Sequence, residues 1–357
     1  MTTPITLLAT GDISPRRDTP EHQFDAVRAM LRSGDITFGQ LESVLTKEGT
    51  GQLWTGYGQR LAGLPDDPDA AANILVEDGF DVMSFATNHT MDRSEAGMEK
   101  TMAAVRAAGV GLVGAGMNID EARAPCVIER AGASVGFLAY CSVTPRGYEA
   151  LPARSGVAPA RARTFYEQVD WQPATPPKIW TIPYPEDLAA MVEDIERLRP
   201  GVDLLVVSMH GGIHFELGTV AMYQYDYSHA AIDAGADTVI WSHGHVAKPI
   251  EVYHGRPVFH GLANFSLLPK GPRGEFYDGS KTFDSCRTQI VRLHVDDGAI
   301  TRVSFLPCWI DERLTPEPTP AADPRFGDFV RFMEWSNDHA GLDTKFEVDG
   351  DEIVIGS

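Results

Sequence analysis

The sequence predicts an α/β fold in which two facing β-sheets are layered between helices. Short apolar runs alternate with helical patterns along most of the 357 residues, as in a chain of βα units. Towards the carboxyl end, two apolar runs are joined across Asp296-Asp297-Gly298, which is a hairpin turn signal. A mixture of βα units and late hairpins indicates a layered domain with mixed sheets.

Hydrophobic periodicity predicts the individual elements. Short apolar stretches between turn residues are expected to be strands, and in chain order they are Ile5–Ala9, Asp35–Phe38, Phe80–Phe85, Val110–Val113, Pro125–Ile128, Ser134–Cys141, Leu204–Met209, Thr238–Trp241, Pro249–Tyr253, Val258–His260, Thr288–His294 and Thr301–Pro307. Apolar residues at three- and four-residue spacing predict helices, over Glu21–Leu31, Asp69–Glu77, Glu95–Ala108, Glu186–Arg197, Tyr223–Ala234 and Asp328–Ser336.

Two segments break this pattern and suggest the domain organisation. Residues 142–183 are rich in Pro, Arg and aromatic residues, and an irregular stretch of this length is usually functional. Residues 311–325 are Pro-rich and lead to the last expected helix. We therefore expect a main domain over residues 1–310, with an inserted lid or substrate loop at 142–183, and a C-terminal appendage over 311–357.

Composition and charge exclude several classes of partner. The chain has 30 Lys+Arg and 50 Asp+Glu, so its formal net charge is −20, and without a basic cluster we expect no nucleic-acid partner. The N-terminus has no signal-like pattern and the longest apolar runs have strand length, which predicts a cytoplasmic protein that does not contact membranes. The scattered cysteines, without a CxxC pair, are expected to be reduced thiols.

Polar residues of the types that bind metal ions follow five of the expected strands. The clusters are Gly11-Asp12, Gln40-Leu41-Glu42, Thr87-Asn88-His89, Met209-His210-Gly211-Gly212 and His243-Gly244-His245. In α/β folds, loops at the carboxyl ends of strands converge on one crevice, so these side chains are expected to meet. Carboxylate, amide and imidazole groups suit Zn, Mn, Fe or a similar divalent ion, and a carboxylate between two imidazole-rich lobes can bridge two ions.

Each of these residues also has an ordinary structural explanation. Asp12 could be a turn or helix-cap residue, Glu42 a solvated loop carboxylate, and His89 a hydrogen-bonded core histidine. For an isolated residue the structural explanation is favoured, because short motifs often match by chance. Five polar clusters at five strand ends favour a functional site.

In their order and placement the clusters resemble the CapA family, which is named for poly-γ-glutamate capsule synthesis. Asn88-His89 followed by Asp92, and Phe259-His260-Gly261-Leu262-Ala263-Asn264-Phe265, belong to the same resemblance, which covers roughly residues 5–310. It implies a layered αββα fold of the calcineurin-like metallophosphoesterase type, with two facing mixed β-sheets flanked by helices. It also implies one or two divalent metal ions and no organic cofactor.

The same resemblance implies a role for each site residue. The implied metal ligands, with Glu42 as the bridging carboxylate, are Asp12, Glu42, Asn88, His210, His243 and His245. His89 would be the general acid/base, oriented by Asp92, and Asn264 would shape the pocket. Beside these, Trp54 and Tyr57 lie in Gly-rich sequence and are expected to line a substrate pocket, while His214 and His260 are expected near it.

The chain departs from the family pattern at three positions. Where the family often has Asn-Leu-Glu, this chain has Gln40 in place of the asparagine. Where the family often has Asn-Asn-His, it has Thr87 in place of the first asparagine, and where the family often has His-Pro-His, it has Gly244 in place of the proline. The first departure could weaken one metal position, so a mononuclear site stays open.

The sequence leaves three activities open: phosphoester hydrolysis, Cα epimerisation of a peptide, and a non-catalytic role in assembling or transporting poly-γ-glutamate. CapA-like proteins include a lasso-peptide epimerase, and the chain resembles this type. The lack of a membrane-anchor signal argues against export, a charge of −20 argues against a polyanionic substrate, and aromatic and Gly-rich loops suit a peptide. We therefore expect a metal-dependent peptide epimerase acting on a peptide or small molecule, in an oligomeric state that the sequence leaves open.

Overall fold

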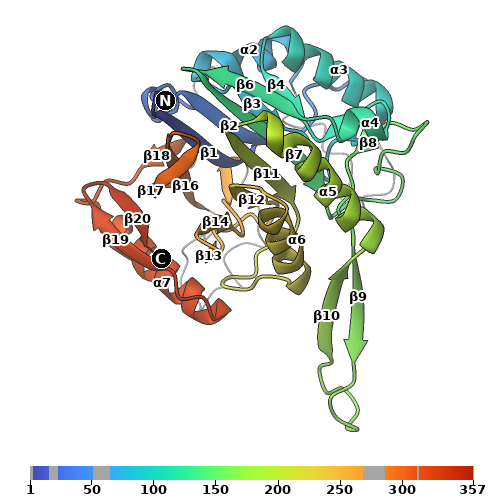
Figure 1. Cartoon of the computed structure of the whole chain (residues 1–357), viewed down its shortest axis with the longest axis vertical. Coiled ribbons are helices and arrows are strands. Elements are labelled where there is room, and N and C mark those ends of the chain that lie inside the picture. Colours follow the sequence, from blue (N-terminus) through green and yellow to red (C-terminus); the bar gives the residue numbers. More distant parts are fainter. Residues whose placement is uncertain (1–2, 16–22, 51–64, 268–285, 312, 357) are drawn as a thin grey trace.

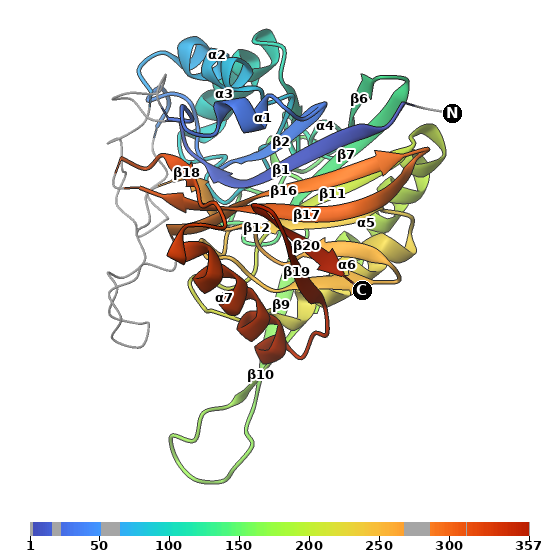
Figure 2. The same cartoon turned by 90° about the vertical axis from the view of Figure 1, so that its left-hand side faces the viewer.

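The computed structural model describes residues 3–15, 23–50, 65–267, 286–311 and 313–356, and in it two β-sheets face each other between helices (Figure 1, Figure 2). The first sheet contains β1 (Ile5–Ile13), β2 (Ile36–Leu41), β3 (Val82–Ser84), β4 (Gly111–Val113), β15 (Asn264–Ser266), β16 (Arg287–Asp296), β17 (Ala299–Ile310), β18 (Pro316–Pro318), β19 (Lys345–Asp349) and β20 (Glu352–Gly356). Its order is β19-β20-β17-β16-β1-β2-β3-β4, with β15 beside β1 and β18 beside β17. β1 to β4 pair in parallel, whereas β16 pairs antiparallel with β1 and β17.

The second sheet is also mixed. Its strands are β6 (Cys126–Arg130), β7 (Ala133–Cys141), β11 (Leu204–His210), β12 (Thr238–Ser242), β13 (Ile250–Tyr253) and β14 (Arg256–Phe259). The order is β13-β14-β12-β11-β7-β6. β7, β11, β12 and β14 are parallel, and the antiparallel strands β6 and β13 form the edges.

Helices cover the outer face of each sheet. The first sheet carries α2 (Pro68–Asp78) and α3 (Ser94–Ala107), and the second carries α5 (Pro185–Leu198), which continues into η3 (Arg199–Gly201), and α6 (Met222–Asp233). The short helices are α1 (Arg28–Leu31) and α4 (Ile119–Ala122), and α7 (Pro324–Ala340) lies near the C-terminus. Asp67 caps α2 by accepting hydrogen bonds from the N–H groups of Asp69 and Ala70, and Gly79, at a φ of 99°, ends it.

Three apolar cores formed by the described residues hold these layers together. Between the sheets, Phe38 of β2 stacks on Phe137 of β7 with ring centroids 5.9 Å apart. Outside the first sheet, helix residues such as Leu75 and Met102 pack in one core, and outside the second sheet Trp241 packs with residues of α6 in another. The predicted layered αββα architecture, with two facing mixed sheets, is therefore confirmed.

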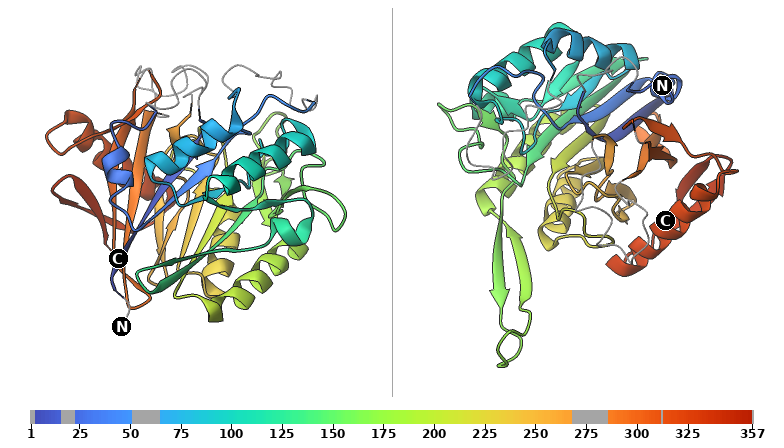
Figure 3. Two further views of the ribbon diagram at one scale, coloured as in Figure 1. Left: turned by 90° about the horizontal axis from the view of Figure 1, so that it is seen from above. Right: turned by 180° about the vertical axis from the view of Figure 1, so that it is seen from behind.

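Residues 142–183 contain more regular structure than expected. β8 (Gly156–Val157) pairs with β5 (Ala115–Gly116), and β9 (Ala162–Glu167) pairs antiparallel with β10 (Lys178–Pro183). The β9–β10 hairpin projects from the layered body (Figure 1 and the right-hand view of Figure 3). The expectation of an irregular stretch was wrong here, because aromatic and β-branched residues of the two strands pair with each other, as Phe165 does with Trp180.

Two other sequence expectations can be compared with the structure. In the described residues, the helix expected over Glu21–Leu31 is limited to Arg28–Leu31, and residues 23–27 before it form turns. Residues 316–356 add three strands and α7 to the main body, with β20 paired to β17. The division into a domain and an appendage stays a prediction.

Two further expectations concern the cysteines and the membrane. All four cysteines are free thiols, and three of them are buried. Within the described ranges, no helix is both long and apolar enough to cross a membrane.

Candidate metal centre

The site lies where the carboxyl ends of strands from both sheets meet. Asp12 lies in the last part of β1, Glu42 directly follows β2, His210 ends β11, and His243 directly follows β12. Because β1 and β2 are parallel, as are β11 and β12, these residues lie at the carboxyl ends of the strands in each sheet. The carboxyl ends of the two sets of strands face each other, so side chains far apart in the sequence converge between them.

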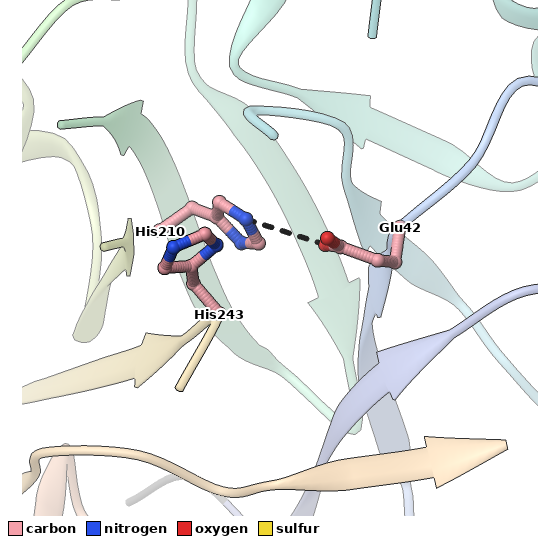
Figure 4. A group of neighbouring side chains, drawn as sticks. All are labelled: Glu42, His210 and His243. Carbon is pink, nitrogen blue, oxygen red and sulfur yellow. Dashed lines mark ion pairs between the residues drawn. The ribbon is translucent and has the colours of Figure 1, made fainter. Parts of the chain in front are cut away.

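Glu42, His210 and His243 form a buried group whose ligand atoms all lie within 4.8 Å of one another. Figure 4 shows the Glu42 carboxylate directed towards the two imidazole rings from the opposite sheet. His210 Nε2 lies 3.3 Å from Glu42 Oε2. The rings of His210 and His243 meet edge to face, with centroids 4.9 Å apart. A carboxylate and two imidazoles are a donor set that borderline divalent ions bind.

Asp12, His245 and Asn264 form a second group beside the first. Asp12 Oδ2 accepts a hydrogen bond of 3.1 Å from the backbone N–H of His243 and lies 3.5 Å from His245 Nδ1. His245 Nδ1 is 2.7 Å from Asn264 Oδ1. Asn264 begins β15 and pairs with Asp12 in the sheet. The pairing of β1 with β15 therefore places Asp12 beside Asn264, and the hydrogen bond from the His243 N–H to Asp12 connects this group to the first.

The loop after β3 supplies the residues at the open side of the site. Asn88 Oδ1 lies 2.9 Å from His210 Nε2, and His89 Nε2 lies 3.8 Å from Glu42 Oε1. His89 Nδ1 is 2.6 Å from Asp92 Oδ2. This is the contact by which Asp92 was expected to orient the His89 ring. The His89 side chain is 38% exposed, while that of Glu42 is 1% exposed. His89 therefore lies between the buried carboxylate and the solvent.

Without a bound cation, burial disfavours the charged forms of Glu42, His210 and His243. Burial, and secondly the negative charge of Asp12, raises the pKa of the Glu42 carboxyl well above its usual value. Burial lowers the pKa of His210 and of His243 well below the usual value, and neighbouring histidines add to the effect. The rings of His214 and His243 are tilted to each other with centroids 3.8 Å apart, and burial is the main cause that lowers the pKa of His214 to about 4. A bound cation would relieve the repulsion between the two carboxylates.

Three buried atoms test whether these residues suit a metal ion. Asp12 Oδ1, Glu42 Oε1 and His243 Nδ1 are buried and make no hydrogen bond with any described residue. Buried polar atoms are rarely left without a partner, and each one needs an explanation. All three belong to the expected ligand set, so the residues present fit a divalent ion.

The backbone of the site is held in unusual conformations. His243, His245 and Ala263 have φ values of 91°, 56° and 68°, in the region that non-glycine residues seldom adopt. Gly11 is required by a close approach, because a β-carbon there would lie 1.9 Å from the carbonyl oxygen of Ala263. Strain of this kind, located on the candidate ligands, is typical of functional sites.

The structure brings most of the expected site residues together. Asp12, Glu42, Asn88, His210, His243, His245, His89, Asp92, His214 and Asn264 all lie in or beside the two groups. Trp54 and Tyr57 lie outside the described residues. His260 instead pairs with Glu251 at 3.0 Å, and the same carboxylate is 2.8 Å from His229.

Sequence reasoning assigned no supporting role to Thr87, Ser242 and Gln40. Thr87 Oγ1 donates a 3.0 Å hydrogen bond to Glu42 Oε2, and the Ser242 hydroxyl lies 3.1 Å from His210 Nδ1. Gln40 and Thr87 lie inside the motifs already noted and are departures from the family pattern, and Ser242 directly precedes the motif His243-Gly244-His245. The sequence feature that could have identified them is a polar side chain within two residues of a candidate ligand.

Comparisons with known proteins agree with this arrangement. The chain matches the family described as bacterial capsule synthesis protein PGA_cap over residues 6–267. It is 25% identical over 298 residues to the PGA biosynthesis protein CapA of Bacillus subtilis, covering 83% of this chain and 66% of that protein. It is 29% identical over 218 residues to a probable polyglutamine synthesis accessory protein of Mycobacterium tuberculosis, covering 60% of this chain and 50% of the relative. The chain thus spans between about half and two thirds of these relatives' lengths.

A solved structure with a similar arrangement is the calcineurin-like phosphoesterase YfkN from Bacillus subtilis. The two chains share 12% sequence identity, with a TM-score of 0.45 over 95% of this chain and 98% of the other.

Proposed function

The chain belongs to the PGA_cap family of bacterial capsule synthesis proteins, and on this premise we propose that it is a metal-dependent enzyme that epimerises a Cα centre in a soluble peptide. The observation that carries the proposal is the set of three partnerless buried atoms, on Asp12, Glu42 and His243, next to the exposed imidazole of His89. These atoms support a site for a divalent ion beside a group able to move a proton. The arrangement suits acid–base chemistry at a substrate bound from the open side.

The ligand set divides into two groups that one or two divalent ions would occupy. Glu42, Asn88 and His210 would hold one position, and Asp12 and His245 the other, with His243 lying near both. When bound, a divalent ion would act as a Lewis acid that polarises a peptide carbonyl or carboxylate and so acidifies the neighbouring Cα–H. The chemistry of the donors fits Zn, Mn or Fe, and no organic cofactor is required.

His89 is the residue that would move the proton. The Asp92 carboxylate accepts a hydrogen bond from the Nδ1–H of His89 and so fixes the orientation of the ring. Nε2 is then the atom that faces Glu42 and the open side of the site. In the proposed reaction Nε2 takes the Cα proton from one face, a solvent molecule donates a proton to the opposite face of the same carbon, and His89 then releases its proton to solvent. No bond between heavy atoms is made or broken, so the product has the mass of the substrate.

Two features support a peptide as the substrate class. A chain with a net charge of −20 disfavours a polyanionic polymer. The β9–β10 hairpin presents exposed aromatic side chains, with Tyr166 at 70% and Trp171 at 86% exposure, which suit contacts with a peptide. These features support a peptide or other neutral small molecule more than an anionic polymer, and no nucleic acid or membrane partner is proposed.

The test is solvent-deuterium incorporation. The metal-loaded protein is incubated in D₂O with synthetic peptides encoded by short reading frames beside its gene, and the products are analysed by chiral amino-acid analysis and mass spectrometry. We expect one deuterium at one Cα, inversion at that centre and no cleavage. The His89→Gln variant should lose the exchange, while Asp226→Asn, on the surface of α6, should retain it.

Phosphoester hydrolysis is the second candidate, because the same geometry places His89 to protonate a leaving group. It is tested in parallel with bis(p-nitrophenyl) phosphate. Release of nitrophenol that depends on His89, with no deuterium uptake by any peptide, would replace epimerisation by hydrolysis. A role in poly-γ-glutamate assembly, suggested by the relatives' names, predicts neither activity.

A further inference from the structure

Gln40 connects the two sheets beneath the metal centre. It lies in β2 and is 1% exposed. Its side-chain Nε2 donates a 3.3 Å hydrogen bond to the backbone carbonyl of Ser84 in β3, within the first sheet. Its Oε1 accepts a 3.2 Å hydrogen bond from the hydroxyl of Ser242, at the end of β12 in the second sheet. Ser242 in turn lies 3.1 Å from Nδ1 of His210.

The direction of each hydrogen bond in this chain is fixed by its first member. A backbone carbonyl can only accept, so the Gln40 amide must present its NH₂ to Ser84 and its oxygen to Ser242. The oxygen of the amide can also only accept, so the single hydroxyl hydrogen of Ser242 is committed to Gln40. The Ser242 oxygen can then only accept at His210, which puts the imidazole hydrogen on Nδ1.

The consequence appears at the other ring nitrogen of His210. With the hydrogen on Nδ1, Nε2 carries a lone pair, and this atom faces Asn88 Oδ1 at 2.9 Å and Glu42 Oε2 at 3.3 Å. The Thr87 hydroxyl, also 3.3 Å away, gives its hydrogen to Glu42. A lone pair directed at oxygen atoms is an arrangement that a cation between them would stabilise.

We propose that Gln40 is a positioning residue, which acts through Ser242 to hold His210 in the tautomer whose Nε2 can bind a metal ion. The proposal rests on the metal site of the proposed function and adds the reason why that site has one protonation pattern. A histidine that binds a metal usually donates a hydrogen bond from its other ring N–H to an oxygen that fixes the ring, and partners of this kind contribute to metal affinity. Here that partner is a hydroxyl, and the glutamine determines the direction of its hydrogen.

Gln40 also stands where the resemblance to the family leads one to expect asparagine, and the two contacts of its amide explain why a glutamine fits. The Gln40 amide contacts Ser84 within its own sheet and Ser242 in the facing sheet. An asparagine is shorter by one methylene group, so it would withdraw from at least one of these partners. The longer side chain therefore supports a ligand, His210, at the site that this departure could have weakened.

The test compares Gln40→Met with a control glutamine. Met has a similar length but offers Ser242 no oxygen of the amide type, so the hydroxyl becomes free to donate to His210 Nδ1. Gln289→Met is the matched control, because Gln289 is equally buried in β16 and its amide has no hydrogen-bond partner among the described residues. Ser242→Ala is a second variant that breaks the same chain at its next link.

Two readouts separate positioning from simple loss of structure. The first is ¹⁵N NMR of the imidazole nitrogens in the metal-free, histidine-labelled protein, with His210 assigned by a His210→Gln variant. We expect the Nδ1–H tautomer in the wild type and in Gln289→Met, and a shift towards Nε2–H in Gln40→Met. The second is Zn²⁺ affinity measured against a chromophoric chelator, where Gln40→Met and Ser242→Ala should each lose about 10- to 100-fold. The double variant should lose no more than the larger single loss.

Two results would overturn the proposal: an unchanged His210 tautomer in Gln40→Met, or a changed tautomer with Zn²⁺ affinity equal to that of Gln289→Met. If the wild type bound no Zn²⁺ at all, the proposed function would fail by a separate measurement. The NMR readout needs neither metal nor substrate, so it tests the positioning role even then. Equal loss of Zn²⁺ affinity in Gln289→Met would also count against Gln40.

Discussion

Lys248 is a buried cation whose removal gives a prediction with a calculable pH dependence. Its side chain is 2% exposed, and Nζ donates hydrogen bonds to the backbone carbonyls of Glu216 and Thr219. These carbonyls belong to the loop that carries His214. We expect the Lys248→Met variant to fold and to differ from the wild type mainly in how its stability depends on pH.

The magnitude follows from the pKa. Burial, only partly offset by the charge of Glu216, lowers the pKa of Lys248 from 10.5 to about 8. At roughly 1.4 kcal/mol per unit, keeping the amine protonated in the folded state costs about 3 kcal/mol near neutral pH. The unfolded chain binds more protons than the folded chain between the two pKa values, so stability rises with pH in this window. From about pH 7 to about pH 9.5, the wild type should gain roughly 2 kcal/mol relative to Lys248→Met.

The assay is urea denaturation of both proteins in the presence of a chelator at several pH values across this window. Every other titrating group is common to both chains, so the difference between their free energies of unfolding isolates Lys248. The neutral amine still donates to both carbonyls, and the wild type should therefore be the more stable protein at high pH. A difference that stays constant across the window would refute the reasoning.

Four further predictions concern the site. Gly11→Ala should lower the free energy of unfolding by more than about 2 kcal/mol, because its β-carbon would lie 1.9 Å from a carbonyl oxygen. Gly201→Ala, whose β-carbon would have nothing within 4 Å, should change it by less than about 0.5 kcal/mol, and equal melting temperatures of the two variants would contradict this. Thr87→Val should destabilise the metal-free protein by about 1 kcal/mol or more through loss of a buried hydrogen bond, and Thr87→Ser should restore it; equal loss in both would exclude the hydroxyl as the cause. His243→Ala should release a divalent ion on dialysis, and an unchanged metal content by elemental analysis would remove this residue from the ligand set. Metal uptake near neutral pH should release protons, because burial raises the pKa of Glu42; calorimetry in buffers of different ionisation enthalpy would show this, and a heat independent of the buffer would contradict it.

Local sequence predicted the elements well where burial and periodicity agree. The strand expected over Leu204–Met209 is β11, extended by one residue, and the helix expected over Glu95–Ala108 is α3 shifted by one residue at each end. The strand expected over Ile5–Ala9 continues to Ile13, because its last residues pair with β2 and β15. That extension depends on a partner more than 250 residues away in sequence, which no local pattern reports.

The β9–β10 hairpin was missed for a different reason. Among the strands that the structure describes, β9 and β10 pair only with each other, so both faces of β9 are largely exposed. No alternation of apolar and polar residues therefore marks this strand. Aromatic and β-branched residues such as Phe165 and Ile179 were the remaining signal. The prolines between the two strands dominated the interpretation, and they lie in the connection.

The candidate ligands were predictable because each follows a strand, but the residues that support them were not. Which side chains meet across the two facing sheets depends on how β2 and β12 are placed relative to each other, and periodicity carries no information on this. Seen from the sequence, Gln40 and Thr87 were departures from the family pattern, and the first of them could weaken one metal position. In the structure, one hydroxyl donates to Glu42 while accepting from the N–H of His89 at 3.2 Å, and one amide directs the hydrogen of Ser242 away from His210. A departure from a family motif is therefore better judged by the hydrogen-bond directions that it imposes on the ligands than by similarity of residue type.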